Sequence, residues 1–280
     1  MIRFLRARLA LPALLLCVLG GAAFAQAQPA QKPYEPQVGQ EGKDVIWVPT
    51  PLALINKMLD MAKLTPSDYV IDLGSGDGRT VIAAAKRGAR ALGIEYNPDM
   101  VELSKRSAAK EGVAAKTNFM KADIFESDFS EATIITMYLL PQLNVRLRPK
   151  LLELKPGTRI VSHAFTMEEW QADQTDTADN RTAYLWIVPA KVDGAWKMPQ
   201  GELTLKQSFQ MLAGTLKAGD STVNIENGRM RGDQITFRAA GAEYTGRVTG
   251  TTIAGTVKGS TSGAWTATRS AKPTAAEPAK

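Results

Sequence analysis

A glycine-rich stretch between a strand pattern and a helix pattern constrains the fold of this chain more than any other feature. Residues 72–78 read Asp-Leu-Gly-Ser-Gly-Asp-Gly. They continue a strand predicted at residues 69–72 and precede a helix predicted at residues 80–87. Glycine adopts positive φ at little cost and lets the backbone approach a ligand closely. The stretch therefore predicts a ligand-binding turn between a strand and a helix.

The alternation of strand and helix patterns continues through residues 45–193. The expected elements are strands at residues 91–95, 117–121, 133–137, 159–164 and 184–188, and helices at residues 98–112 and 142–154. This alternation predicts an α/β domain with a Rossmann-like, doubly wound, mostly parallel sheet whose last strand is antiparallel. Such sheets bind ligands at the carboxyl ends of their strands, near the point where the strand order reverses.

The sequence changes character at residue 194. Residues 194–270 are rich in Gly and Thr, and short alternating runs are separated by turn signals such as Asn227-Gly228. This pattern predicts a small all-β antiparallel domain, a sandwich or barrel of six or seven strands, with Trp196 and Trp265 in its core. We expect residues 26–44 to form a linker and residues 271–280 a disordered tail, because both contain several Pro residues.

The first 25 residues have the organisation of a secretory signal peptide. Arg3, Arg6 and Arg8 precede an apolar segment at residues 9–20, and Ala23-Phe24-Ala25 is a typical cleavage site. We expect an exported protein, periplasmic or secreted, that associates with the cell envelope. The alternative is an uncleaved segment that anchors the body outside the membrane. Cleavage removes three Arg and lowers the net charge from +6 to +3, which gives no reason to expect a nucleic-acid partner.

The scarcity of metal-binding and nucleophilic side chains excludes several classes of enzyme. The chain has one Cys, Cys17, and one His, His163. A Cys/His zinc site needs several such ligands, and a disulfide needs two cysteines. No Gly-x-Ser-x-Gly sequence surrounds any Ser, which disfavours a Ser–His hydrolase. We therefore expect a protein without a bound metal.

The spacing of the glycines distinguishes two classes of cofactor. A dinucleotide fingerprint, Gly-x-Gly-x-x-Gly, would need its third Gly where the chain has Arg79. The spacing here is Gly-x-Gly-x-Gly with an acid two residues earlier, and it resembles the first motif of S-adenosylmethionine-dependent methyltransferases with the seven-strand Rossmann-like fold. An acid near the loop suits a ligand that carries an ammonium and a sulfonium. The resemblance assigns cofactor binding to Asp72, Gly74, Ser75, Gly76 and Gly78.

Acidic residues also mark the ends of the next two predicted strands. Glu95 ends the second strand, and Asp123 follows the third. A carboxylate at the end of the second strand, the position of Glu95, accepts hydrogen bonds from ribose hydroxyls. By resemblance to the methyltransferases, Asp123 would meet the adenine amino group, and Ile124 or Phe125 would pack on the adenine ring. Acids at strand ends also form turns and caps, so the prediction depends on three such acids occurring together with the glycine loop.

The resemblance becomes more specific outside the loop and covers residues 45–188. It is carried by Trp47-Val-Pro-Thr-Pro51, Gly93-Ile-Glu-Tyr-Asn-Pro98 and Leu154-Lys-Pro-Gly-Thr-Arg-Ile-Val-Ser-His163. With the loop, these sequences resemble the mitochondrial protein-lysine N-methyltransferases that act on the ATP synthase c-subunit and the adenine nucleotide translocase, and their bacterial relatives. The resemblance implies methyl transfer from S-adenosylmethionine to a lysine of a protein substrate, with Thr50 closing over the methionine end of the cofactor.

The residues after the fourth predicted strand bear on the acceptor. They read Thr136-Met-Tyr-Leu-Leu-Pro141 and lack the Asn/Asp-Pro-Pro-Tyr motif of methyltransferases that act on planar amino groups. A lysine amine must be neutral to attack, and a desolvated pocket lowers its pKa. Tyr138 is the expected aromatic wall of that pocket, and His163 is a candidate for contact with the acceptor or for a base. Both have a structural alternative, as a buried aromatic and as a hydrogen-bonded His.

Two other functions stay open at this stage. An exported protein would act outside the cytoplasm. We expect little S-adenosylmethionine there, because this cofactor is found in the cytoplasm. A non-catalytic protein that uses its two domains to bind a nucleoside-like ligand or a partner is therefore one alternative. An NAD-binding oxidoreductase is the other, although Arg79 disfavours it.

Overall fold

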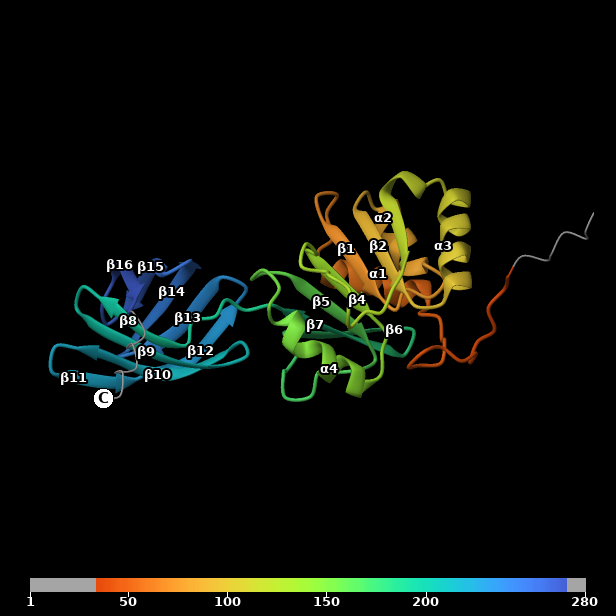
Figure 1. Ribbon diagram of the computed structural model, residues 1–280. Helices are drawn as coiled ribbons and strands as arrows, with labels where there is room; N and C mark the ends of the chain where they lie inside the picture. The colour runs from red at the N-terminus through yellow and green to blue at the C-terminus, as the bar shows by residue number, and fades with distance from the viewer. Residues whose placement is uncertain (1–33, 271–280) are drawn as a thin grey trace, which may run out of the picture. The chain divides into compact units, whose positions relative to one another are not determined.

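The computed structural model describes residues 34–270, which form two sheets from successive parts of the chain (Figure 1). The predicted signal peptide, the first part of the predicted linker and the predicted tail at residues 271–280 lie outside the described residues. Among the residues that are described, no helix combines the length and the apolarity needed to cross a bilayer.

The first sheet has seven strands in the order β3-β2-β1-β4-β5-β7-β6. Its parallel strands are β1 (Tyr69–Leu73), β2 (Arg90–Glu95), β3 (Thr117–Lys121), β4 (Ile134–Met137) and β5 (Arg159–His163). β7 (Arg181–Ile187) runs antiparallel to β5, and β6 (Gln174–Ala178) runs antiparallel to β7. The strand order reverses between β1 and β4, so the predicted Rossmann-like, doubly wound sheet is confirmed.

Strand β6 is the part of this sheet that the sequence pattern does not predict. It is polar and largely exposed, and no apolar run marks it in the sequence. Its connection to β7 is Asp179-Asn180, and both residues have positive φ, at 51° and 56°. Two consecutive residues of this kind form a two-residue turn whose twist matches that of a hairpin.

Helices cover both faces of this sheet (Figure 1). The elements are α1 (Leu52–Met61), α2 (Arg79–Lys86), α3 (Pro98–Lys110), the 3₁₀ turn Ala114–Lys116 and α4 (Pro141–Leu151). Side chains alternate along β1, so that Val70 packs in the cluster with α1, α2 and α3, and Ile71 packs in the cluster with α4. The carboxyl ends of the strands are thereby held between two apolar layers.

The second sheet is built from antiparallel strands and closes on itself. Its strands are β8 (Gly194–Met198), β9 (Gly201–Ser208), β10 (Met211–Ala218), β11 (Ser221–Asn224), β12 (Glu226–Arg231), β13 (Gln234–Ala239), β14 (Ala242–Thr249), β15 (Thr252–Gly259) and β16 (Gly263–Arg269). Closure follows because β9, at one end of the strand order, also pairs with β10.

The small antiparallel domain is therefore confirmed, but it has nine strands where the sequence predicts six or seven. The difference arises partly because β11 and β12 both pair with β10, as two short pieces on either side of Ile225. Trp196 and Trp265 are buried in its core, as predicted, at 0% and 3% exposure. Phe237 and Tyr244 stack there with ring centroids 4.7 Å apart.

Candidate functional site

A cavity of about 730 Å³ lies at the carboxyl ends of β1 to β4. Its wall comes mainly from residues 40–50, the glycine loop, the residues after β2 and β3, and residues 137–140. The cavity therefore coincides with the point where the strand order reverses, which is where a doubly wound sheet binds its ligand.

The glycine loop is shaped by close contacts on two sides. Gly76 has φ +53°, and a Cβ atom there would lie 2.7 Å from the Trp47 indole nitrogen, so only glycine fits beneath that ring. Gly78 is different, because it does not line the cavity. A Cβ atom on Gly78 would lie 2.7 Å from Phe119 and Ser104, and its φ is +78°. These contacts show that Gly78 lets α2 begin tightly against β3 and α3, and its contact with the cofactor stays a prediction.

Asp72 places a buried carboxylate in the wall of the cavity. The residue is 6% exposed, and its Oδ1 accepts a hydrogen bond of 2.6 Å from the Thr136 hydroxyl. Burial raises the pKa of Asp72 to about 7, and the nearby carboxylates of Glu95 and Asp77 add to the rise. A buried anion among other anions favours a ligand that brings positive charge.

Glu95, at the end of β2, holds the loop in place. One of its carboxylate oxygens accepts from the Gly76 backbone N–H at 2.8 Å, and the other accepts from the Asn97 backbone N–H at 2.9 Å. Each carboxylate oxygen can accept a second hydrogen bond, which leaves capacity for ligand hydroxyls. Glu95 therefore fixes the conformation of the glycine loop and also contributes a negative charge to the cavity wall.

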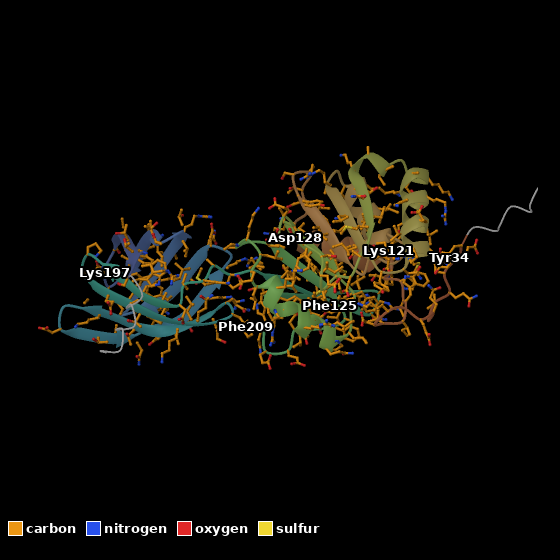
Figure 2. The ribbon with its side chains drawn as sticks, viewed as in Figure 1. Tyr34, Lys121, Phe125, Asp128, Lys197 and Phe209 are labelled. Carbon is orange, nitrogen blue, oxygen red and sulfur yellow. The ribbon has the colours of Figure 1, made fainter. Side chains whose placement is uncertain are left out.

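Asp123 lies in the segment after β3. Figure 2 labels Lys121 and Phe125, the residues two positions before and after it in the chain. Its carboxylate accepts from the Phe125 backbone N–H at 2.9 Å and forms an ion pair with Lys43. The hydrogen bond from Lys43 lowers the pKa of Asp123, which is therefore ionised at neutral pH. Ile124 lines the cavity beside it.

Thr50, Tyr138 and His163 meet near the ends of β4 and β5. Thr50 Oγ1 and His163 Nδ1 are 3.0 Å apart, and the rings of Tyr138 and His163 stack with centroids separated by 3.7 Å. Phe165 also stacks with Tyr138, at 6.0 Å. Thr50, Tyr138 and Phe165 line the cavity, whereas His163 is 1% exposed and does not.

His163 therefore supports the wall of the cavity from behind. Burial, together with the nearby charge of Arg181, lowers the pKa of His163 to about 4, so the ring is neutral at pH 7. Because the ring does not reach the cavity, the geometry favours its structural alternative over the prediction that it contacts the acceptor or acts as a base.

Comparisons with known proteins identify the family. Residues 72–174 match the family described as the ANTKMT methyltransferase domain, and residues 31–106 match a DNA methylase family. A protein-lysine N-methyltransferase from Saccharolobus islandicus is 42% identical over 151 residues, which are 51% of this chain and 94% of that protein. This chain belongs to the S-adenosylmethionine-dependent methyltransferases.

Two further relatives of this methyltransferase differ in the acceptor that they are named for. The crystal structure of an RNA methyltransferase from Salinibacter ruber with S-adenosylhomocysteine is 47% identical, with a TM-score of 0.51. The match covers 52% of this chain and 96% of the Salinibacter ruber chain. The ATP synthase c-subunit lysine N-methyltransferase of Xenopus laevis is 36% identical over 128 residues, 45% of this chain and 56% of that protein.

The wall of the cavity fits the cofactor of the methyltransferases, S-adenosylmethionine. In this cavity Asp72 would face the charged methionine end, Glu95 would accept from the ribose hydroxyls, and Asp123 would accept from the adenine amino group. Ser75 Oγ is buried at the same wall and has no hydrogen-bond partner among residues 34–270. The structure thus brings eight of the nine predicted cofactor-binding residues to one cavity, all except Gly78.

Three residues of the methyltransferase site were missed by the sequence reasoning. The sequence patterns predict a linker around Lys43, indicate no role for Phe165 and mark Trp47 only as part of a motif. Trp47 had a signal, because an aromatic beside Pro49 and Thr50 lies in the segment expected to close the site. Lys43 and Phe165 had none, since their positions depend on a hairpin and a loop with no regular pattern.

Proposed function

We propose that this methyltransferase transfers a methyl group to the side-chain amine of a lysine in a protein substrate. The observation that carries the proposal is the pair of stacked aromatic rings, Tyr138 and Phe165, in the cavity wall beside Thr50. An aromatic wall attracts a cationic head group and excludes water from it. The curated relatives named above as lysine N-methyltransferases support the same acceptor.

The chain's own residues position and desolvate the acceptor. S-adenosylmethionine supplies the electrophilic methyl group when it is bound. A lysine amine has a reference pKa of about 10.4 and must lose its proton before it attacks. The aliphatic wall formed by Leu139 and Leu140 desolvates the amine and so lowers that pKa. A neutral His163 behind Tyr138 adds no positive charge that would repel the arriving lysine.

A nucleic-acid amine is the second candidate acceptor. It is favoured by the name of the Salinibacter ruber relative and by the DNA methylase match. The segment after β4 opposes it, because Met137-Tyr138-Leu139-Leu140 replaces the motif that holds a planar amino group. The net charge of +3 without the first 25 residues also provides little attraction for phosphates.

The test is transfer of a labelled methyl group from S-adenosylmethionine to fractionated extracts of the source organism. We expect label in envelope protein that is resistant to nuclease and sensitive to protease, and mass spectrometry should locate it on lysine. The Tyr138→Phe and Tyr138→Ala variants should lower turnover progressively while S-adenosylmethionine binding is retained. Tyr69→Phe, outside the cavity, is the matched control. Label confined to nuclease-sensitive material would reject the lysine acceptor.

We also propose that the enzyme is exported and meets its substrate in the cell envelope. The support is the charged, apolar and small-residue order of residues 1–25. Export implies that the cofactor reaches the enzyme outside the cytoplasm. Mass spectrometry of the protein purified from cell fractions should find a chain that begins at Gln26 outside the cytoplasm. An intact chain in the cytoplasm would contradict export.

A further inference from the structure

A small hairpin ahead of α1 forms part of the cofactor cavity. The Gly39 N–H donates to the Trp47 carbonyl at 2.8 Å, and the Trp47 N–H donates to the Gln40 carbonyl at 2.9 Å. At the other end, the Gly42 N–H donates to the Val45 carbonyl at 3.0 Å, which closes a turn with Lys43 at its tip. The base of the hairpin rests on the glycine loop through the Trp47 indole, which leaves no room for a Cβ atom on Gly76.

Lys43, at the tip of this hairpin, reaches the part of the same cavity that Asp123 lines. Lys43 Nζ forms an ion pair with Asp123 and lies 4.9 Å from the centre of the Tyr96 ring. It also lies 3.9 Å from Asp44 Oδ2. Lys43, Tyr96 and Asp123 all line the cavity. The side chain of Asp123 is only 16% exposed, so its carboxylate has little other access to donors.

Lys43 thus makes the interactions that the adenine end of the cofactor would need. Asp123 is the acceptor assigned to the adenine amino group. Its Oδ1 accepts from the Phe125 backbone N–H and its Oδ2 from Lys43, and because the side chain is only 16% exposed, another donor reaches Oδ2 by displacing the ammonium. The face of the Tyr96 ring can likewise contact either the Lys43 ammonium, as it does here, or the adenine ring of a bound cofactor. Lys43 therefore occupies the contacts at Asp123 and Tyr96 that the adenine end would use.

We propose that Lys43 competes with the adenine amino group for Asp123 and thereby sets the affinity of the enzyme for its cofactor. In the free protein the ion pair holds the hairpin tip on the site, and cofactor binding requires Lys43 to leave Asp123. The free energy of that ion pair is subtracted from the binding energy of every adenosine-containing ligand. This proposal rests on the assignment of S-adenosylmethionine as the cofactor but is independent of the acceptor.

The test is calorimetric titration of S-adenosylhomocysteine into the full chain and its variants. Lys43→Met should bind about three- to fivefold more tightly than the wild type, the range expected for a partly exposed ion pair. Lys43→Arg should stay close to the wild type, because it keeps the cation. Lys57→Met, which removes a lysine paired with Asp176 outside the cavity, should leave the affinity unchanged.

A double-mutant cycle makes the test specific for Asp123. In the Asp123→Asn background, which weakens binding by itself, Lys43→Met should give no further tightening. Raising the salt concentration should weaken the competing ion pair, so the advantage of Lys43→Met over the wild type should shrink. Unchanged or weaker binding by Lys43→Met, or equal tightening in the Asp123→Asn background, would overturn the proposal. Absence of binding by the wild type would instead overturn the cofactor assignment.

Discussion

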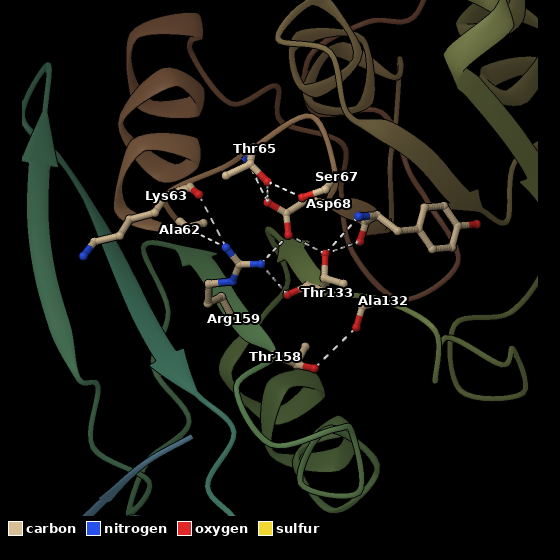
Figure 3. A network of polar contacts seen from close by, with 10 residues as sticks. Ala62, Lys63, Thr65, Ser67, Asp68, Ala132, Thr133, Thr158 and Arg159 are labelled. Atoms are coloured by element: carbon tan, nitrogen blue, oxygen red, sulfur yellow. Dashed lines mark hydrogen bonds and ion pairs between the residues drawn. The ribbon is translucent and has the colours of Figure 1, made fainter. Parts of the chain in front are cut away.

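Asp68 and Asp72 stand at opposite ends of β1, equally buried at 5% and 6% exposure, and their surroundings treat the charge in opposite ways. Figure 3 shows the network around Asp68 at the amino end. Its carboxylate accepts from Thr133 Oγ1 at 2.7 Å and from the Thr65 N–H at 2.8 Å, and it forms an ion pair with Arg159. Burial opposes ionisation there, but these hydrogen bonds outweigh it and lower the pKa of Asp68.

Asp72 has no such cation beside it among the described residues. Its bond from Thr136 does not offset burial, and the neighbouring charges of Glu95 and Asp77 are negative. The pKa of Asp72 therefore rises to about 7 where that of Asp68 falls. The comparison shows two ways to accommodate a buried carboxylate. The charge of Asp68 is compensated by Arg159 and hydroxyl groups of the protein, whereas the charge of Asp72 would be compensated by a cationic ligand.

The largest expected effect is on folding, at the amino end. Asp68→Asn removes the anion that pairs with Arg159 and leaves a guanidinium in a mostly buried network. We expect the free energy of unfolding to fall by about 2 kcal/mol, measured by urea denaturation. The folded fraction should still bind S-adenosylmethionine with unchanged affinity. A variant of wild-type stability would mean that the hydroxyls alone hold this end together.

The reverse pattern is expected for Asp72→Asn. The variant removes the anion that faces the cationic end of the cofactor, so S-adenosylmethionine should bind about tenfold more weakly, a cost of about 1.4 kcal/mol. Stability at pH 8 should be equal or higher, because an amide in this position carries no charge to desolvate. Calorimetric titration and urea denaturation of the same two samples separate these results. A variant that loses stability but keeps its affinity would make Asp72 structural, like Asp68.

A smaller effect is expected from pH. Because the pKa of Asp72 is raised to about 7, the free protein takes up a proton there as the pH falls, and binding of a cation favours the ionised form. The affinity of the wild type for S-adenosylmethionine should fall about fivefold between pH 7 and pH 6, a window in which the ligand's amine stays protonated. Calorimetry of Asp72→Asn over the same window should show a flat profile. An equal slope in both proteins would assign the titration to another group.

The sequence predicts most of the fold and most of the cofactor end of the site, for physical reasons that differ between residues. The parallel strands β1, β2, β4 and β5 are largely buried and therefore stand out as apolar runs, and acids at strand ends converge because those ends share one edge. Strand β6 escapes this logic, since it is exposed and polar and is marked only by the turn Asp179-Asn180.

The features that the sequence patterns do not predict are contacts between segments far apart in the chain. Gly78 has the spacing of a cofactor-binding glycine, yet the contacts that require it come from Phe119 and Ser104. His163 ends a strand at the correct edge, but Tyr138 stands between its ring and the cavity. Lys43 reaches Asp123 across 80 residues of sequence, and no periodicity encodes such an approach.

The closure of the second sheet limits how copies of this protein can associate through their strands at high concentration. Within the described part of the chain, every strand of that sheet except the four-residue β11 has a neighbour on both sides. Where a strand pairs along both sides, it has no free row of N–H and C=O groups on which another copy can add. The junction of β16 with β8 is the exception, because it has only two residue pairs, Thr268–Lys197 and Arg269–Trp196. Addition of a strand from another copy is thereby limited to β11 and to the part of β16 before Thr268.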